Sequence, residues 1–231
     1  MNNSIKERLA QVQDQVARAA QDCGCDPEDV RLLAVSKRHP VEAILEAHNA
    51  GQMAFGESYA QELVEKAEAC AGVDGLQFEY IGPIQSNKVK LIVGNCRLIH
   101  AIDRPKVLRY VSKQAVELGI EQDILLEVHI SPEPSKHGCR PENLAGLLEL
   151  AVNTPGVNPR GLMAMPPYTE DPEGARPYFR QLRVMRDQLK EKFQLASFNE
   201  LSMGMSHDFK VAIEEGASIV RVGTAIFGER D

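Results

Sequence analysis

Short apolar runs alternate with longer stretches of helical periodicity along nearly the whole chain. Eight runs are rich in β-branched and aliphatic residues, at 32–36, 53–56, 78–82, 98–102, 124–130, 161–165, 200–204 and 219–225. Each run but the last is followed by a segment in which apolar residues recur at helical spacing. This alternation is typical of parallel β/α units and predicts a single (β/α)8 TIM barrel with an extra N-terminal helix. An open doubly wound sheet is the alternative.

Three helical segments carry recognisable ends. Residues 4–22 begin with Ser4 and Glu7, which match a capping box, and stop before Gly24. The apolar face of this first segment is formed by Ile5, Leu9, Val12 and Val16. A second helix is expected at 173–193, and a third at 206–216 with Ser206 as its N-cap.

Composition and charge narrow the possible functions. The chain has 231 residues, 43% of them hydrophobic, enough for one barrel-sized domain over 1–231, and no linker or low-complexity tract divides it. Its net charge of −7 disfavours nucleic acid and anionic membrane surfaces as partners. Neither a signal peptide nor a membrane span is expected, so we predict a soluble, cytoplasmic protein.

The cysteines and histidines point to no metal site. The five cysteines are odd in number and mostly far apart, which indicates free thiols in a reducing compartment. The six histidines show no metal-ligand spacing, and we expect no metal.

Lys37 is the first candidate for chemistry. It follows the apolar run Leu32–Val35 and Ser36, which places it at the carboxyl end of the first predicted strand. Barrel enzymes carry their reactive groups at this end of the strands. A lysine held in an apolar, electropositive mouth loses proton affinity, and its amine then attacks carbonyl groups. The alternative is a solvated lysine on a loop.

The last two predicted strands supply further polar groups. Arg221 lies between Val220 and Val222 in a strand expected to be buried on both faces, so its guanidinium needs hydrogen-bond acceptors. Either a ligand or a buried carboxylate could supply them. The segment LSMGMSHD (201–208) and the pair Gly223 and Thr224 resemble phosphate-binding turns, with Ser206 at the start of a helix whose free N–H groups favour an anion. The alternative for 201–208 is a routine turn with a serine cap.

Together these groups match one cofactor. Pyridoxal phosphate (PLP) offers an aldehyde to a lysine, a phosphate to backbone-rich turns and a ring nitrogen to an arginine. Lysine-dependent aldolases share only two of these features.

At these residues the sequence closely resembles the PLP homeostasis protein family, often called the YggS/PROSC type, which shares the fold-type III barrel of the alanine racemases. The resemblance runs through AVSK (34–37), FGESYAQE (55–62), IGPIQSNK (81–88), SKHG (135–138), GLMAMPP (161–167), LSMGMSHD (201–208) and VRVGTAIFG (220–228). It implies that Lys37 forms the internal aldimine and that Arg221 faces the pyridine nitrogen. It implies a site at or beside the phosphate for Ser202, Gly204, Ser206, Gly223 and Thr224.

We add two residues to this cofactor-binding set and note two departures. Met203 lies between Ser202 and Gly204 in the same segment, and Ser58 lies in the second motif. The family usually has Asn where Ser58 stands and His where Glu79 stands, which puts in question the contacts that these two side chains make.

The chemistry expected of such a site is limited. A guanidinium donates hydrogen bonds and keeps its proton, so the pyridine nitrogen stays unprotonated and PLP becomes a weak electron sink. Racemisation also needs a second base, which in the alanine racemases is a tyrosine from an extra C-terminal domain of the partner subunit. This chain ends at Asp231, and we expect no such domain. Tyr59 and Tyr168 could replace that tyrosine, or could simply be packed or solvated.

The leading hypothesis is therefore a PLP-binding protein that holds PLP as a lysine aldimine and acts in intracellular PLP homeostasis. We expect no robust catalysis and assign no catalytic residue. The competing hypotheses are a low-activity PLP-dependent amino-acid racemase and a PLP-free lysine aldolase. PLP-dependent apo-enzymes are candidate partners, and the chain is expected to be a monomer. Lys88 and Lys136 could assist transfer of the aldehyde, or be ordinary surface lysines.

Overall fold

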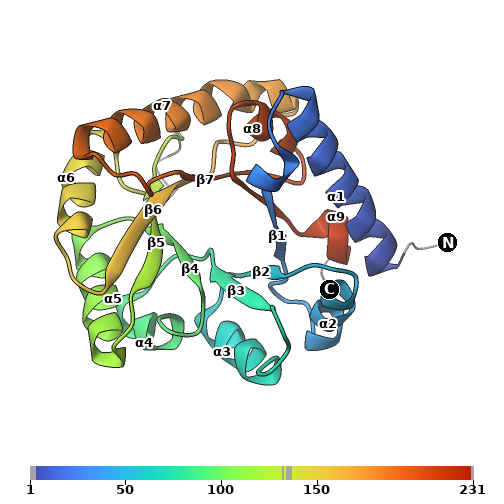
Figure 1. Ribbon diagram of the computed structural model, residues 1–231, viewed down its shortest axis with the longest axis horizontal. Helices are drawn as coiled ribbons and strands as arrows, with labels where there is room; N and C mark the ends of the chain where they lie inside the picture. The colour runs from blue at the N-terminus through green and yellow to red at the C-terminus, as the bar shows by residue number, and fades with distance from the viewer. Residues whose placement is uncertain (1–3, 132, 134–136, 230–231) are drawn as a thin grey trace.

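Eight parallel strands close into a barrel in the order of the chain (Figure 1). The computed structural model describes residues 4–131, 133 and 137–229. The strands are β1 (Arg31–Val35), β2 (Ala54–Glu57), β3 (Gln77–Tyr80), β4 (Leu98–Ile102), β5 (Gln122–Val128), β6 (Val157–Ala164), β7 (Glu200–Met205) and β8 (Ile219–Val222). Each strand pairs in parallel with the next, and β1 pairs with β8. The predicted closed barrel is confirmed, and the open sheet is excluded.

Helices surround the barrel on the outside (Figure 1). The α-helices are α1 (Ile5–Asp22), α2 (Val41–Asn49), α3 (Ala60–Ala69), α4 (Val89–Ile92), α5 (Pro105–Leu118), α6 (Pro141–Val152), α7 (Arg176–Phe193), α8 (Phe209–Glu214) and α9 (Thr224–Phe227). Short 3-10 turns are η1 (Pro27–Asp29), η2 (Ser86–Lys88) and η3 (Pro172–Ala175). In the described ranges no helix is long and apolar enough to cross a membrane.

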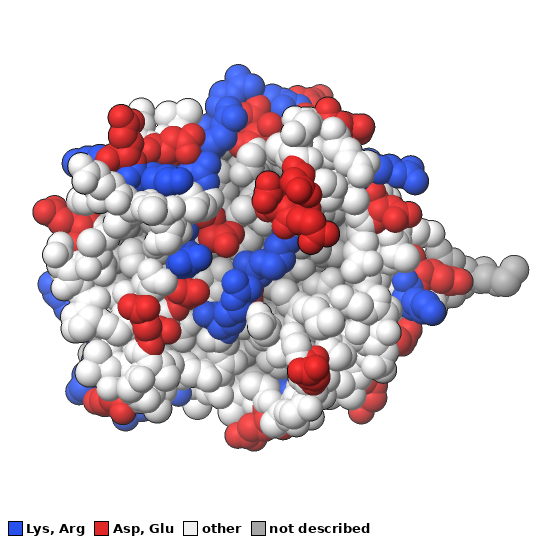
Figure 2. All heavy atoms as spheres, in the orientation of Figure 1, with Lys and Arg blue, Asp and Glu red and all other residues white. Residues whose placement is uncertain are grey.

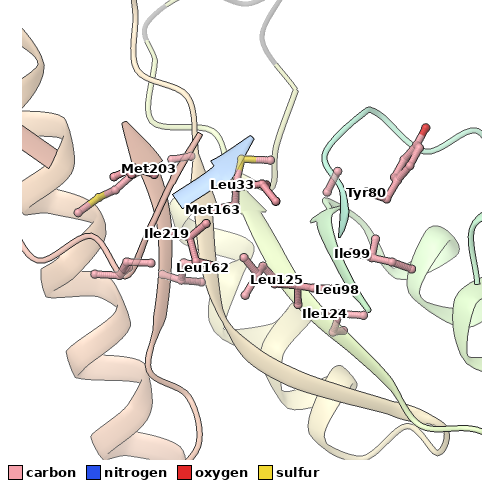
Figure 3. Close-up of a cluster of buried hydrophobic side chains, with 14 of the residues drawn as sticks. Leu33, Tyr80, Leu98, Ile99, Ile124, Leu125, Leu162, Met163, Met203 and Ile219 are labelled. Atoms are coloured by element: carbon pink, nitrogen blue, oxygen red, sulfur yellow. The ribbon is translucent and has the colours of Figure 1, made fainter. Parts of the chain in front are cut away.

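The strands are buried on both faces, as the near-continuous apolar runs require. Figure 3 shows one cluster of their side chains, which includes Leu33, Ile99, Ile124, Leu162 and Ile219 from five of the strands. All five are fully buried. Each such side chain contributes roughly 1.5–3 kcal/mol when it leaves water, so this core supplies much of the stability that holds the strand ends in place.

The predicted N-terminal helix is confirmed with its capping box. The hydroxyl of Ser4 accepts a hydrogen bond from the backbone N–H of Glu7, and the Glu7 carboxylate accepts one from the N–H of Ser4. Helix α1 packs against α8 and α9, beside the joint between β8 and β1. Arg8 Nε donates to the carbonyl of Ile226 at 2.6 Å, which ties α1 to the end of the chain.

Several predicted element boundaries are wrong by a few residues, including the start of β6, which begins at Val157 rather than at residue 161. Residues 172–175 form the 3-10 turn η3, and α7 begins at Arg176 because Pro177 fits only in a first helical turn. Helix α8 begins at Phe209 rather than at Ser206, since the Asp208 carboxylate accepts the N–H of Met205 at 2.6 Å and closes a turn over 206–208. Strand β8 ends at Val222, and α9 follows from Thr224.

Figure 2 shows acidic and basic side chains interspersed over the face in view, without a broad basic area. This distribution agrees with the net charge of −7.

Candidate functional site

A cavity of about 760 Å³ opens at the carboxyl end of the barrel strands. Its walls come from the segments that follow β1, β2, β3, β6, β7 and β8, where barrel proteins carry their ligands. The lining residues are Val35, Lys37, Ser58, Tyr59, Ala60, Gln61, Tyr80, Ile81, Gly82, Pro83, Gln85, Lys88, Met163, Met165, Met205, Ser206, His207, Arg221, Gly223 and Thr224. Six of the nine predicted cofactor-binding residues are among them.

The backbone on both sides of Lys37 is held by the side chains of α3. Lys66 Nζ donates to the carbonyl of Ser36 at 2.7 Å, and Glu62 Oε1 accepts the N–H of Arg38 at 2.5 Å. Arg38 has a left-handed backbone with φ of 64°, which costs a non-glycine residue roughly 1–2 kcal/mol. The surrounding bonds therefore fix a turn that would otherwise relax, and this turn directs half-buried Lys37 into the cavity.

Beneath this turn lies a buried charged cluster that sequence reasoning missed. Lys66 Nζ lies 2.7 Å from Glu57 Oε1 and 2.7 Å from Glu62 Oε1, and the Ser36 hydroxyl donates to Glu57 Oε1 at 2.6 Å. Burial raises the pKa of Glu57, although Lys66 and Ser36 oppose the shift. In the sequence Glu62 and Lys66 look like an ordinary solvated pair of an exposed helix face, and no pattern indicates that Lys66 is buried.

Arg221 lies under the cavity with most of its surface buried. Nη1 donates to both the carbonyl and the hydroxyl of Ser202 at 2.7 Å, and Nη2 donates to the carbonyl of Ala164 at 3.1 Å. These acceptors are neutral, so the buried carboxylate considered from the sequence is not its partner among the described residues. A guanidinium has five N–H groups, and those left over can donate to a ligand in the cavity.

Arg221 keeps its positive charge although it is buried. Desolvation lowers its pKa to about 10, while the carboxylates of Asp208 and Glu127 act in the opposite direction. The group therefore remains protonated at neutral pH and acts only as a donor.

A polar relay crosses the barrel interior below Arg221. The Ser202 hydroxyl on β7 lies 2.9 Å from His100 Nδ1 on β4, and His100 Nε2 lies 2.8 Å from Glu79 Oε2 on β3. Glu79 also forms an ion pair with Arg31 at the start of β1, and Arg97 Nη1 lies 3.7 Å from its Oε1. Since β4 and β7 are not neighbours, the His100–Ser202 contact spans the barrel.

The protonation of the relay follows from its partners. Burial by itself would raise the pKa of Glu79, but the His100 hydrogen bond and the charges of Arg31 and Arg97 outweigh it, so the pKa is lowered. Burial lowers the pKa of His100 despite the nearby Glu79 carboxylate. His100 is therefore neutral, donates from Nε2 to Glu79 and accepts the Ser202 hydroxyl at Nδ1. The departure from the family at Glu79 thus supplies the carboxylate of this relay.

The predicted phosphate-binding residues divide into two groups. Ser206, Gly223 and Thr224 line the cavity, and neither hydroxyl has a hydrogen-bond partner among the described residues. Ser202, Met203 and Gly204 are buried behind the lining, where Ser202 contacts Arg221 and His100.

Gly204 is required by backbone geometry. Its φ is +87°, and a Cβ there would lie 2.5 Å from Ala212 Cβ and 2.9 Å from Phe209 Cα. Only glycine allows β7 to turn this closely over α8.

Two tyrosines and two lysines were considered from the sequence as candidate bases and amines, and the structure describes three of these four residues. Tyr59 lines the cavity and its hydroxyl accepts from Arg38 Nη2 at 3.0 Å, whereas Tyr168 is 77% exposed and contacts the His207 ring instead. Lys88 lines the cavity. Lys136 lies outside the described residues.

The fold and lining residues define a class: a (β/α)8 barrel whose mouth carries a lysine after β1 and a guanidinium on β8. The family model for the N-terminal domain of alanine racemase matches residues 8–231. The pyridoxal phosphate homeostasis protein of Aquifex aeolicus is 46% identical over 97% of both chains, and that of Vibrio cholerae is 42% identical over 99% of this chain and 97% of its own.

A solved structure agrees with these sequence relatives. The structure of PipY from Synechococcus elongatus with PLP bound superposes with a TM-score of 0.87 at 34% identity, covering 97% of this chain and 100% of PipY. The chain therefore belongs to the pyridoxal phosphate homeostasis protein family, as the sequence motifs indicated.

Proposed function

We propose that this protein binds PLP covalently through Lys37 and acts in PLP homeostasis without robust catalysis. The observation that carries the proposal is that Lys37 and Arg221, from the two ends of the barrel sequence, line one cavity. Relatives aligned over their full length are named pyridoxal phosphate homeostasis proteins, and PipY holds PLP in its solved structure.

The lining residues fit the parts of PLP. The Lys37 amine would hold the aldehyde, and an N–H of Arg221 not used by Ser202 or Ala164 would donate to the ring nitrogen. The hydroxyls of Ser206 and Thr224 and the backbone beside Gly223 would hold the phosphate, and Ser58 lines the same cavity after β2. When bound, PLP supplies an electrophilic carbon for which amines compete. Ser202, Met203 and Gly204 support the site from behind.

The described lining holds neither a carboxylate nor a readily ionised Tyr80 for proton transfer at a substrate carbon. Burial raises the pKa of Tyr80 to about 12, and its hydroxyl lies 3.1 Å from the carbonyl of Ser58, so this phenol stays protonated. Among the described lining residues there is no carboxylate. Arg221, charged at neutral pH, could only donate a hydrogen bond to the ring nitrogen, so PLP held here would supply a weak electron sink.

The test is the visible absorption spectrum of protein reconstituted with PLP, before and after Lys37→Ala. We expect an absorption band that is lost in the variant, and a borohydride-fixed adduct on the peptide that contains Lys37. Lys113→Ala, at a lysine with 74% of its side chain exposed, should keep the band. A band that survives Lys37→Ala would contradict the proposal.

A weak racemase is the second candidate, favoured by the match to the alanine racemase N-terminal domain and by Tyr59 in the lining. Solvent deuterium appearing at the α-carbon of an amino acid would support it, and Tyr59→Phe should then abolish the exchange.

We also propose that the protein acts in the cytoplasm as a monomer and supplies PLP-dependent apo-enzymes. The five unpaired cysteines fit a reducing compartment, and the closed barrel has no edge strand to pair with another copy. Sedimentation equilibrium of the purified chain would test the oligomeric state.

A further inference from the structure

The charge of the cavity lining differs from that of the whole chain. Lys37, Lys88 and Arg221 line the cavity, and no described Asp or Glu does. The chain as a whole has 33 acidic and 26 basic residues. A lining with three cationic side chains and no described carboxylate favours ligands that carry negative charge.

Topology separates these cations into two sides of the mouth. Lys37 follows β1 and Arg221 lies in β8, and these two strands pair with each other. The hydroxyls assigned to the phosphate follow β7 and β8. Lys88 ends η2, in the connection after β3. In a closed barrel of eight strands β3 lies opposite β7. Lys88 therefore lies across the mouth from the residues assigned to the phosphate. The charge of Lys88 can therefore bind an anionic group other than the phosphate of PLP.

The segment that carries Lys88 is fixed. The N–H of Lys88 donates to the carbonyl of Gln85 at 2.9 Å, and the following Val89 and Ile92 are buried against the barrel. The ammonium of Lys88 makes no hydrogen bond or ion pair with any residue that the structure describes. Gln61 and Gln85 line the cavity beside it and offer further donors.

The cavity also has room for more than the cofactor. Its volume of about 760 Å³ lies in the upper part of the range for drug-sized ligands, whereas PLP is one six-membered ring with small substituents.

We propose that Lys88, with Gln85, binds the carboxylate of an amino acid whose amine takes PLP from Lys37. This inference rests on the proposed function and adds the chemical class of compound that unloads the site. The amine nitrogen of the amino acid forms a bond to the aldehyde-derived carbon while the bond from that carbon to the Lys37 nitrogen breaks. The two N–H hydrogens lost by the incoming neutral amine end on the Lys37 nitrogen, which leaves as a free amine, and nothing is oxidised or reduced.

The experiment measures release of PLP from the loaded protein, by loss of the protein-bound absorption band, with alanine and with alaninamide. The two compounds differ in the carboxylate, and they are compared at equal concentrations of neutral amine. We expect alanine to release PLP about tenfold faster, or at about a tenth of the concentration, since a hydrogen-bonded charge pair contributes about 1.5 kcal/mol.

Lys88→Met should remove this preference and Lys88→Arg should keep most of it. Lys90→Met is the matched control, because Lys90 is exposed two residues later and does not line the cavity. Equal release by the two compounds in the wild-type protein, or a preference that persists in Lys88→Met, would overturn the inference.

Two further outcomes are distinguishable. A borohydride-fixed adduct on Lys88 itself would mean that Lys88 accepts the aldehyde covalently, which also overturns the carboxylate role. Failure of the wild-type protein to show any absorption band with PLP would instead contradict the proposed function.

Discussion

Glu127, in β5, is a buried carboxyl group with an altered affinity for protons. Burial raises its pKa from 4.5 to about 7, the charge of Asp103 adds to the shift, and Arg221 opposes it. Between these two values the unfolded chain loses the proton while the folded protein keeps it. Stability should therefore fall as pH rises through this window.

Glu127→Gln removes this titration. The variant should match the wild type near pH 4 and gain up to about 3 kcal/mol in the free energy of unfolding above pH 8, from a shift of about 1.4 kcal/mol per unit. Urea denaturation across this pH range measures the difference. Glu142→Gln, at an exposed position in α6, should leave the pH profile unchanged. A constant offset between Glu127→Gln and the wild type would contradict the interpretation.

At the scale of single residues, the sequence predicted the groups that stand out from an apolar background. Lys37 follows four apolar residues, and Arg221 lies inside a β-branched run, so each is conspicuous. Lys66 and His100 were not predicted, because their burial depends on which segments far apart in the chain become neighbours.

At the scale of elements, the turn after β7 depends on Gly204. An alanine there combines an unfavourable φ of +87° with a contact at 2.5 Å to Ala212 Cβ. We expect Gly204→Ala to lower the free energy of unfolding by about 2–5 kcal/mol and to weaken PLP binding, because Ser206 follows in the same turn.

Gly24→Ala separates the cost of the positive φ from the cost of the contact with Ala212. Gly24 has a similar φ of +75°, but a Cβ there meets nothing within 4 Å. Its loss should be about 1–2 kcal/mol, measured by urea denaturation beside Gly204→Ala. Equal losses would mean that the contact with Ala212 contributes nothing.

Element boundaries were predicted less well than element types. The helix start at Ser206 was wrong because the carboxylate of Asp208, two residues later, closes the turn instead. The strand end at 225 was wrong because α9 begins at Thr224. The first error reflects local competition between polar groups, which hydrophobic periodicity does not report.

At the scale of the whole molecule, the relay from Arg31 to Arg221 joins strands on opposite sides of the barrel. Its carboxylate, Glu79, has a lowered pKa, so the stability that it contributes is present at neutral pH and is lost as pH falls through that pKa. Glu79→Gln leaves Arg31 without its charged partner. It should cost about 3 kcal/mol at pH 7, and the cost should shrink in acid.

The absorption band of bound PLP should survive Glu79→Gln, because Arg221 keeps its bonds to the carbonyls of Ser202 and Ala164. Thermal unfolding and the visible spectrum measure the two effects. Glu117→Gln, from an exposed pair with Lys113, should change stability by less than about 1 kcal/mol. Unchanged stability in Glu79→Gln would mean that the relay contributes nothing to folding.

The barrel itself was predictable because eight repeats of one pattern reinforce each other. Errors of a few residues at the end of a strand do not change its neighbours, and closure of the sheet brings the ends of β1 and β8 together. The relay was not predictable, since a contact from β4 to β7 requires knowledge of the interior.

The cationic side chains that line the cavity have a kinetic consequence. In a protein that is acidic overall, a cavity lined by cationic side chains concentrates the electric field at one point of the surface. Small anions should be steered toward that point from a distance, divalent metal ions should be repelled from it, and the rate of encounter should drop as ionic strength shortens the reach of the field.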